Sequence, residues 1–190
     1  MTSIRINRLL PGITTLGPGP RFGVWVQGCA LACRGCASVD TWDRAGGADV
    51  DVDALARQIL DAAARDALTG ITITGGEPID QASGLAALLD AIALDPLGAG
   101  LDVLVFTGYA LPAARRRGAA LLDRADTIIA GPYRADLPSD RPLVASSNQQ
   151  VVHLTARGAL RHADSAGPGH TDPRPTIQVM ARGGELVLVG

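Results

Sequence analysis

The three cysteines of this 190-residue chain are gathered in one short segment, residues 28–36, where Cys29, Cys33 and Cys36 have the spacing CxxxCxxC. An odd number of cysteines cannot all pair as disulfides. Free cysteine is an uncommon residue, and three within eight positions favour a shared metal site over incidental cysteines. The segment therefore predicts a site built on thiolates.

Two kinds of metal site are compatible with these thiolates. A structural zinc ion takes four ligands, and the fourth would have to be His153, His162 or His170, all distant in the sequence. A 4Fe-4S cluster normally takes four cysteines. With three, one iron lacks a protein ligand and is open to a substrate. We favour this cluster, and zinc is the alternative.

Length and composition indicate one ordinary domain, residues 1–190, because 190 residues with 47% hydrophobic side chains can bury a sizeable core. The net charge of −2 gives no electrostatic case for nucleic acid or an anionic membrane. We expect no signal peptide and no membrane helix. We expect a cytoplasmic protein, because a reducing compartment keeps thiolates free. The one basic run, residues 115–117, is interpreted as a solvated helix end.

Apolar periodicity predicts strands that alternate with helices, which is typical of an α/β fold with a parallel sheet. The predicted core strands are residues 22–27, 70–74, 101–106 and 126–130, and the predicted helices are residues 53–64, 83–93 and 112–122. The flanking predictions are a short strand at 3–6, a loop at 135–148, a strand at 150–154, a loop at 163–175, and a C-terminal hairpin of 176–180 and 185–189. Sites in such folds gather at the carboxyl ends of parallel strands, where the cysteine segment lies.

A second motif follows the second core strand, at Gly75, Gly76, Glu77 and Pro78. Glycines let the backbone approach a ligand closely. The glycine carbonyls and the Glu77 carboxylate can accept hydrogen bonds from an ammonium group. An ordinary turn between strand and helix is the alternative, but the cysteine motif at the end of another strand favours a ligand.

Together these motifs resemble the radical S-adenosylmethionine (SAM) superfamily, and within it the activating protein of anaerobic ribonucleotide reductase. The matching blocks occur in the family's order and span about residues 17–154. They are residues 17–21, 24–28, the cysteine segment, 41–42, 74–78, 106–109, 131–133 and 146–149.

The resemblance implies a partial parallel (βα) barrel, with its core at about residues 17–154 and a C-terminal extension at 155–190. It implies a 4Fe-4S cluster on the three cysteines, with SAM bound at the open iron. The residues that it places at SAM are Gly75, Gly76, Glu77, Pro78 and Thr107.

The activity implied is reductive cleavage of SAM to a 5′-deoxyadenosyl radical, which generates a glycyl radical on a partner such as anaerobic ribonucleotide reductase. A one-electron donor such as flavodoxin or ferredoxin is implied with it. Two alternatives stay open. One is a radical SAM enzyme that modifies a peptide or a small metabolite, and the other is a cluster- or zinc-binding module without SAM turnover.

Several polar positions have two interpretations. The segment 107–109 either borders the active site near the SAM ribose or forms an ordinary turn, and residues 146–149 either order a loop or contact substrate. We expect His153 to be a half-buried structural residue, and His162 and His170 to be solvated.

Gln27 and Trp42 flank the cysteine segment, and Trp42 is expected to pack over it. Two positions depart from the family's pattern. Ala37 stands where the activating proteins often have an aromatic residue or histidine, and Ala130 stands where they usually have aspartate. These departures bear on the substrate and leave the radical chemistry unchanged.

Overall fold

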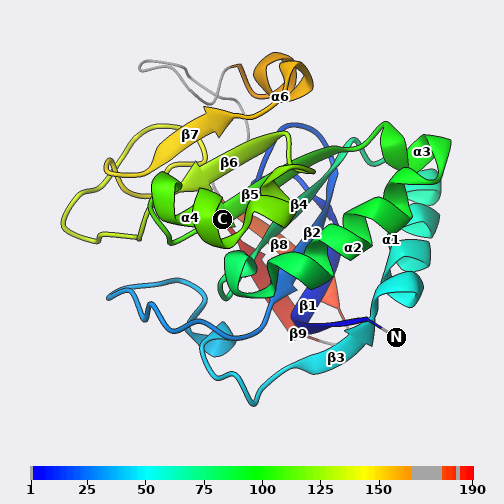
Figure 1. Ribbon diagram of the computed structural model, residues 1–190. Coiled ribbons are helices and arrows are strands. Elements are labelled where there is room, and N and C mark those ends of the chain that lie inside the picture. The colour runs from blue at the N-terminus through cyan, green and yellow to red at the C-terminus, as the bar shows by residue number, and fades with distance from the viewer. Residues whose placement is uncertain (1, 164–176, 183–184) are drawn as a thin grey trace.

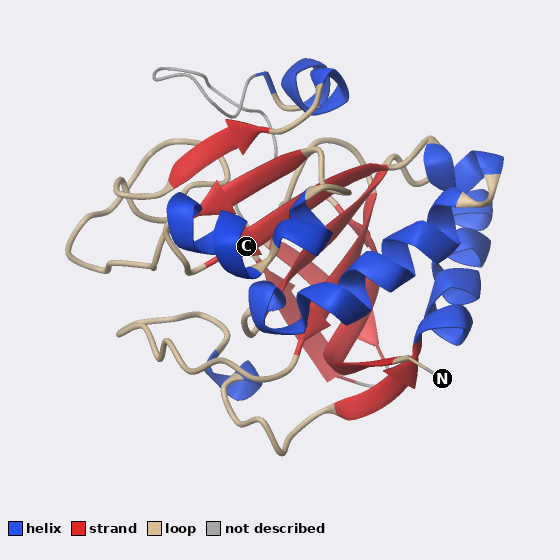
Figure 2. Cartoon of the chain, viewed as in Figure 1, coloured by secondary structure: helices blue, strands red, loops and turns tan. Residues whose placement is uncertain are grey.

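The computed structural model describes residues 2–163, 177–182 and 185–190. Figures 1 and 2 show a sheet with helices packed along it. In chain order the elements are β1 (Ser3–Ile13), β2 (Arg21–Val26), the 3-10 helix η1 (Val39–Thr41), β3 (Ala48–Asp51), α1 (Val52–Asp66), β4 (Gly70–Gly75), the 3-10 helix η2 (Pro78–Gln81), α2 (Ala82–Ala93), α3 (Pro96–Ala99), β5 (Asp102–Thr107), α4 (Leu111–Arg117), α5 (Ala119–Leu122), β6 (Thr127–Ala130), β7 (Gln150–His153), α6 (Ala156–Arg161), β8 (Gln178–Arg182) and β9 (Glu185–Val189).

The main sheet has seven strands in the order β3-β1-β2-β4-β5-β6-β7. The neighbours β2, β4, β5 and β6 are parallel, while β1, β3 and β7 join antiparallel at the two sides. These four parallel strands are the predicted core strands, and the α/β class with a parallel centre is confirmed. Their carboxyl ends lie at one edge of the sheet, which is where the loop after each strand begins.

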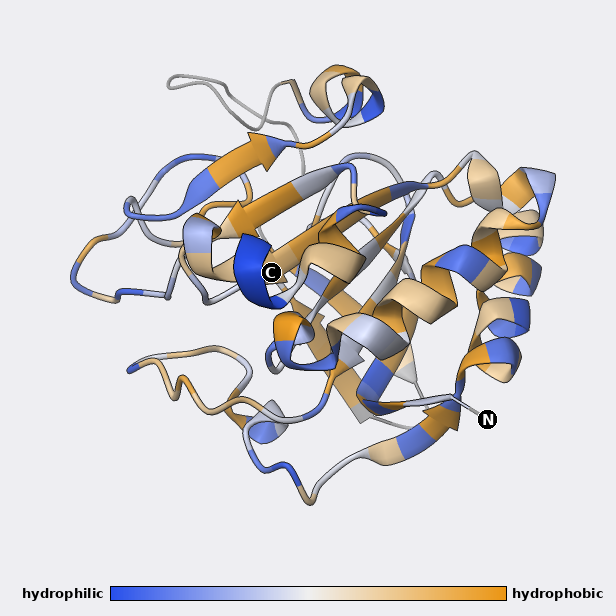
Figure 3. Ribbon diagram, in the orientation of Figure 1, coloured by the Kyte–Doolittle hydropathy of each residue, from blue (hydrophilic) through white to orange (hydrophobic). Residues whose placement is uncertain are grey.

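Helix α1 illustrates why the chain folds as predicted. Its start is capped by Asp51, whose carboxylate accepts a hydrogen bond from the Ala54 N–H at 3.0 Å. Its end is marked by Ala67, which has the left-handed φ of 48°. Between them Leu55 and Ile59 are buried against the sheet. Figure 3 shows the resulting pattern, with hydrophobic strands inside and helices that carry both apolar and polar surfaces.

The C-terminal hairpin β8–β9 is confirmed, and it covers the face of the sheet opposite α1 and α2 (Figure 1). Alternate residues of β2 face the two sides: Val24 joins the core under the helices, and Trp25 packs with Leu10 and Val189 under the hairpin. Gln178 fastens the hairpin to the end of β1, since its side-chain oxygen accepts from the Thr14 N–H at 2.8 Å. Both faces of β2 are therefore buried.

Two local predictions were wrong, and one helix had no prediction. The first strand runs to Ile13, because it pairs with β2 beyond the predicted residues 3–6. The predicted helix at 112–122 is broken into α4 and α5 at Gly118, where a side chain would collide with Ile79. Helix α6 was not predicted. It is capped by Thr155, whose hydroxyl accepts from the Gly158 N–H at 3.0 Å.

His162 was expected to be solvated, and this was also wrong. Its side chain is buried and its Nε2 lies 2.7 Å from Oδ2 of Asp102. His153 is half-buried as expected, with Nδ1 3.2 Å from the Thr127 hydroxyl. His170 and most of the predicted loop at 163–175 lie outside the described residues. No helix in the described part of the chain is long and apolar enough to cross a membrane.

Candidate metal centre

The cysteine loop leaves the carboxyl end of β2 and returns to it. Gly28 has the left-handed φ of 96°, which turns the chain out of the strand. Its N–H donates to the Thr41 carbonyl at 2.7 Å, and the Cys29 N–H donates to the Trp42 carbonyl at 3.1 Å. These two hydrogen bonds close the neck of a loop that holds all three cysteines. We call residues 28–42 the cluster loop.

The three thiols are free and partly exposed. Backbone N–H groups of Leu31 and Ala32 reach the sulfur of Cys29, and the Ser38 N–H donates to the Cys36 sulfur at 3.4 Å. Burial raises the pKa of the Cys29 thiol, while the two N–H groups lower it and the carboxylate of Glu77 raises it. Such N–H groups stabilise a thiolate and, in cluster proteins, tune the reduction potential.

The three thiols and the N–H groups around them show whether this loop could hold a 4Fe-4S cluster. Three free thiols lie on one loop with small neighbours, and backbone N–H groups are directed at two of the sulfurs, so the residues fit a cluster with one iron left open. Across the described residues, no three Cys, His, Asp or Glu side chains are gathered tightly enough to hold a single metal ion.

The Gly75–Pro78 motif lies directly beside the cluster loop. The Glu77 N–H donates to the Gly28 carbonyl at 2.9 Å, and the Gly76 N–H donates to the Val26 carbonyl at 2.8 Å. A side chain at Gly75 would lie 2.8 Å from backbone atoms of β2, and one at Gly76 would collide with the Gly28 carbonyl. The two glycines therefore allow this loop to contact the neck of the cluster loop. The sequence alone had instead indicated a close approach of the backbone to a ligand at these glycines.

The Glu77 carboxylate is buried and joins the ends of β4 and β5. Oε1 accepts from the Thr107 hydroxyl at 2.7 Å and from the Ile79 N–H at 2.9 Å, and Oε2 accepts from the Gly108 N–H at 2.9 Å. Burial raises the pKa of Glu77, and these three hydrogen bonds oppose that rise. A carboxylate has about four acceptor positions, so these three hydrogen bonds leave one unused.

Asp80, which the sequence did not single out, links three segments at this edge. It accepts from the Tyr109 hydroxyl at 2.9 Å and pairs with Arg44 at 3.2 Å and Arg117 at 3.5 Å. The Arg117 guanidinium also lies 4.6 Å from the centre of the Tyr109 ring. The end of the basic run thus contacts Asp80 and Tyr109, although its three arginines are exposed at the end of α4 as expected.

Residues 146–149 order the loop that follows β6. The buried Ser146 hydroxyl accepts from the Arg134 N–H at 3.2 Å, and Gln149 donates to the Gly131 carbonyl at 3.1 Å. Asn148 donates to the Pro132 carbonyl at 2.8 Å. These contacts support the loop-ordering interpretation of the segment.

The loop after β6 lies against the cluster loop. A Cβ built on Gly35 would be 3.4 Å from the Tyr133 ring and from the Ala135 side chain. Of the two departures from the family's pattern, Ala37 is exposed and Ala130 is buried, paired in the sheet with Gln150. Glu77, after β4, contacts Gly28, and a Cβ on Gly108, after β5, would collide with Leu31. The cluster loop is therefore bordered by the ends of β4, β5 and β6.

A second polar cluster lies at the opposite edge, where β2 and β5 begin. Arg21 donates to both carboxylate oxygens of Asp102, at 3.0 and 2.8 Å, and His162 reaches the same carboxylate. Burial alone would raise the pKa of Asp102, but the hydrogen bonds from His162 and Arg21 lower it to about 2. Sequence analysis missed this cluster, since its members are far apart in the chain.

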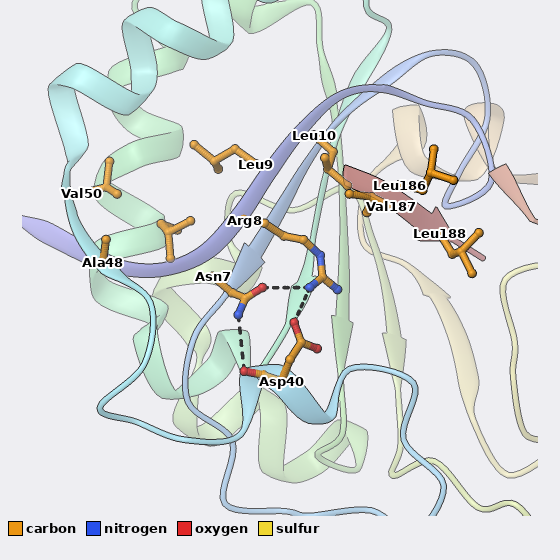
Figure 4. Close-up of a pocket in the computed structure, with 11 residues that line it drawn as sticks. Asn7, Arg8, Leu9, Leu10, Asp40, Ala48, Val50, Leu186, Val187 and Leu188 are labelled. Carbon is orange, nitrogen blue, oxygen red and sulfur yellow. Dashed lines mark hydrogen bonds and ion pairs between the residues drawn. The ribbon is translucent and has the colours of Figure 1, made fainter. Parts of the chain in front are cut away.

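Figure 4 shows an open groove between β1 and β9. Its volume is about 790 Å³, and Asp40 of the cluster loop is among its lining residues. Arg8 and Asp40 form an ion pair at one end, and Leu186 and Leu188 of β9 line the other side. The predicted cysteines and the Gly75–Pro78 motif are not among its lining residues.

Comparison with known proteins places the chain in a family. The anaerobic ribonucleoside-triphosphate reductase-activating protein of Enterobacteria phage T4 is 26% identical over 161 residues, which cover 82% of this chain and 97% of the phage protein. The protein of the same name from Salmonella typhimurium is 28% identical over 153 residues, covering 79% and 98%. The pyruvate formate-lyase 1-activating enzyme of Escherichia coli is 40% identical over 73 residues, covering 36% of this chain and 29% of that enzyme.

These matches confirm the resemblance that the sequence blocks indicated. The family model for a 4Fe-4S single cluster domain matches residues 15–153, which include the three cysteines, the Gly75–Pro78 motif and all four parallel strands. The chain belongs to the 4Fe-4S single cluster domain family.

Proposed function

We propose that this protein is a radical SAM enzyme of the activating type, with a 4Fe-4S cluster held by Cys29, Cys33 and Cys36. When bound, the cluster supplies the electron that cleaves SAM to methionine and a 5′-deoxyadenosyl radical. The hydrogen atom is taken from a glycine of a partner enzyme such as anaerobic ribonucleotide reductase. The names and the coverage of the relatives support this activity.

The observation that carries the proposal is the direct contact between the two motifs. The hydrogen bond from the Glu77 N–H to the Gly28 carbonyl, 2.9 Å long, holds the proposed SAM loop, residues 75–78, against the neck of the cluster loop. A molecule that must reach both an open iron and an ammonium-binding loop needs these groups side by side. Two strands that end at one sheet edge provide that arrangement.

The roles of the SAM residues follow from their contacts. Glu77 has one acceptor position left for the SAM ammonium group, and the carbonyls of Gly75 and Gly76 lie in the same loop. The Thr107 hydroxyl donates to Glu77 and accepts from the Tyr109 N–H at 3.1 Å, so it orients that carboxylate as well as bordering the site. Pro78 begins η2 and fixes the chain direction after Glu77.

The wider setting is part of the proposal. We take residues 1–190 as a single domain with its core at 17–154, and the open sheet as the curved wall of a partial barrel. We place the protein in the cytoplasm, where thiolates stay reduced. A flavodoxin- or ferredoxin-type donor would deliver the electron.

Anaerobic reconstitution tests the proposal. The protein is loaded with iron and sulfide, reduced and mixed with SAM, and 5′-deoxyadenosine and methionine are measured. We expect both products from the wild type, and neither products nor a cluster from Cys33→Ala. A bound cluster without SAM cleavage, or retention of zinc in place of iron, would contradict the proposal.

The hydrogen donor is tested separately. The reduced, SAM-loaded protein is incubated with the large subunit of anaerobic ribonucleotide reductase, and an organic radical is sought by electron paramagnetic resonance (EPR). A glycyl radical signal supports the activating function. SAM cleavage with no such radical would favour a peptide or a small metabolite as substrate.

A further inference from the structure

Gln27 is the last residue before the cluster loop, and its side chain is buried at the neck of that loop. It is 4% exposed. Its Nε2 donates to the Asp43 carbonyl at 2.6 Å and to the Asp40 carbonyl at 3.3 Å, and its Oε1 accepts from Asn7 at 2.7 Å. Both donor positions and one acceptor position of the amide are therefore used.

These contacts hold residues 40–43, at the end of the cluster loop, where the chain returns to β2. The carbonyls of Thr41 and Trp42, which accept from Gly28 and Cys29, lie between the two carbonyls that Gln27 binds. Without Gln27 this segment would keep the two hydrogen bonds at the neck and more exposed contacts, such as the Arg8–Asp40 ion pair. The side-chain amide of Gln27 thus fixes the position of the Cys29 backbone, because it holds the segment to which the Cys29 N–H donates.

The chain around Gln27 leaves little room for another arrangement. A side chain at Gly46 would lie 2.7 Å from Nε2 of Gln27, and one at Gly47 would lie 2.9 Å from its Cβ. The backbone carbonyl of Gln27 also accepts from Gln81 at 3.0 Å, in the 3-10 helix that follows Glu77. One residue therefore connects the cluster loop with the proposed SAM loop.

We propose that Gln27 is a positioning residue for the cluster, which acts by holding Cys29 in a fixed place relative to Cys33, Cys36 and Glu77. The proposal rests on the proposed function, because it assumes that the three thiols hold a cluster. Groups that hydrogen-bond around the ligands of a metal site commonly fix ligand geometry and metal retention. Gln27 differs from them in holding the loop backbone through main-chain carbonyls.

The test compares Gln27→Leu and Gln27→Glu with the wild type after anaerobic loading with iron and sulfide. Leucine removes both donors and the acceptor, whereas glutamate keeps the acceptor for Asn7 and places a charged oxygen against the two carbonyls. The first measurement is the rate of iron release to a chelator. The second is the EPR line shape of the reduced cluster before and after addition of SAM. Matched controls are Gln150→Leu and Gln150→Glu, since Gln150 is an exposed glutamine of β7.

We expect iron release at least about tenfold faster in both Gln27 variants, with a broadened EPR line, because the main-chain carbonyls of Asp40 and Asp43 lose the amide donor that holds them. The Gln150 controls should match the wild type. Release within about twofold of the wild type together with an unchanged line shape, in a Gln27 variant whose apo form is folded by circular dichroism, would overturn the proposal.

If neither Gln27 variant folds, Gly46→Ala supplies the same test, because its methyl group would press on the amide from outside. Iron release as slow as in the wild type would then overturn the proposal, and faster release with a broadened line would support it. Failure of the wild type to bind a cluster would instead refute the proposed function. Iron release is measured without SAM cleavage, so the two failures are distinguishable.

Discussion

Replacing Asp102 by asparagine should lower the free energy of unfolding more than almost any other single polar substitution in this protein. Arg21, Asp102 and His162 are each at most 1% exposed, and the carboxylate accepts two hydrogen bonds from Arg21 and contacts His162 at 2.7 Å. An asparagine at this position would leave the Arg21 guanidinium buried without a counter-charge. Removing one partner of a buried ion pair costs roughly 3–5 kcal/mol. The total free energy of unfolding of a single domain is about 5–15 kcal/mol, so this loss is a large part of it.

The assay is urea unfolding of the apo protein, followed by circular dichroism at about pH 7. Asp49→Asn is the control, because Asp49 pairs with Arg5 at 2.9 Å on the surface with its side chain 62% exposed. That variant should lose at most about 1 kcal/mol. A loss of less than about 1 kcal/mol for Asp102→Asn would refute the argument that the buried charges depend on each other.

The same variant has a pH signature. Burial would raise the pKa of Asp102, but the hydrogen bonds from His162 and Arg21 outweigh it and lower the pKa from 3.8 to about 2. A group with a lowered pKa in the folded state contributes stability above its unfolded pKa and loses that contribution as pH falls through its folded pKa. The wild type should therefore lose about 2 kcal/mol of its advantage over Asp102→Asn between about pH 5 and pH 2. A constant difference across that range would contradict the assignment.

Three further predictions concern the site and its supports. Glu77→Gln should weaken SAM binding by at least about tenfold in anaerobic titrations, because one amide oxygen cannot serve three donors and a ligand cation; unchanged affinity would remove Glu77 from the site. Gly118→Ala should lower stability by about 1–3 kcal/mol in thermal unfolding, since its methyl group would collide with Ile79; an unchanged midpoint would show that the α4–α5 break tolerates a side chain. Ser146→Ala should speed proteolysis within residues 134–148, because the buried hydroxyl that accepts from the backbone there is lost; equal cleavage rates would count against the loop-ordering role.

Local and periodic features of this fold could be predicted from the sequence. The four parallel strands, α1, α2 and the hairpin each have an apolar repeat and a turn signal within their own residues, and each is present in the structure. The placement of the cysteine segment and Glu77 at one sheet edge follows from those strands alone. The break at Gly118 escaped prediction because the helix period continues across it, and only contact with Ile79, distant in the chain, requires glycine there.

Long-range polar pairing could not be predicted. Asp102 and His162 are 60 positions apart, and a histidine in a polar tail has no local signal of burial. Asp80 was missed for the same reason, since its partners Arg44, Tyr109 and Arg117 come from three other segments. The sequence indicated that Gly75 and Gly76 allow a close approach of the backbone. The structure shows that what approaches them is the backbone of β2 and of Gly28, which the sequence did not reveal.

Strand β2 explains how a loop without regular structure can have a defined position. All six residues of β2 are buried, Arg21 is fixed at its start by Asp102, and Gln27 is fixed just after its end by two carbonyls. The strand cannot shift along its axis without breaking the Arg21–Asp102 ion pair or the hydrogen bonds of Gln27. The position of Gly28, and hence of the cluster loop, is therefore determined by residues outside the cysteine motif. Ala37 is exposed on the cluster loop and takes no part in these contacts, whereas Gln27, on the proposal above, holds Cys29 through the carbonyls of Asp40 and Asp43.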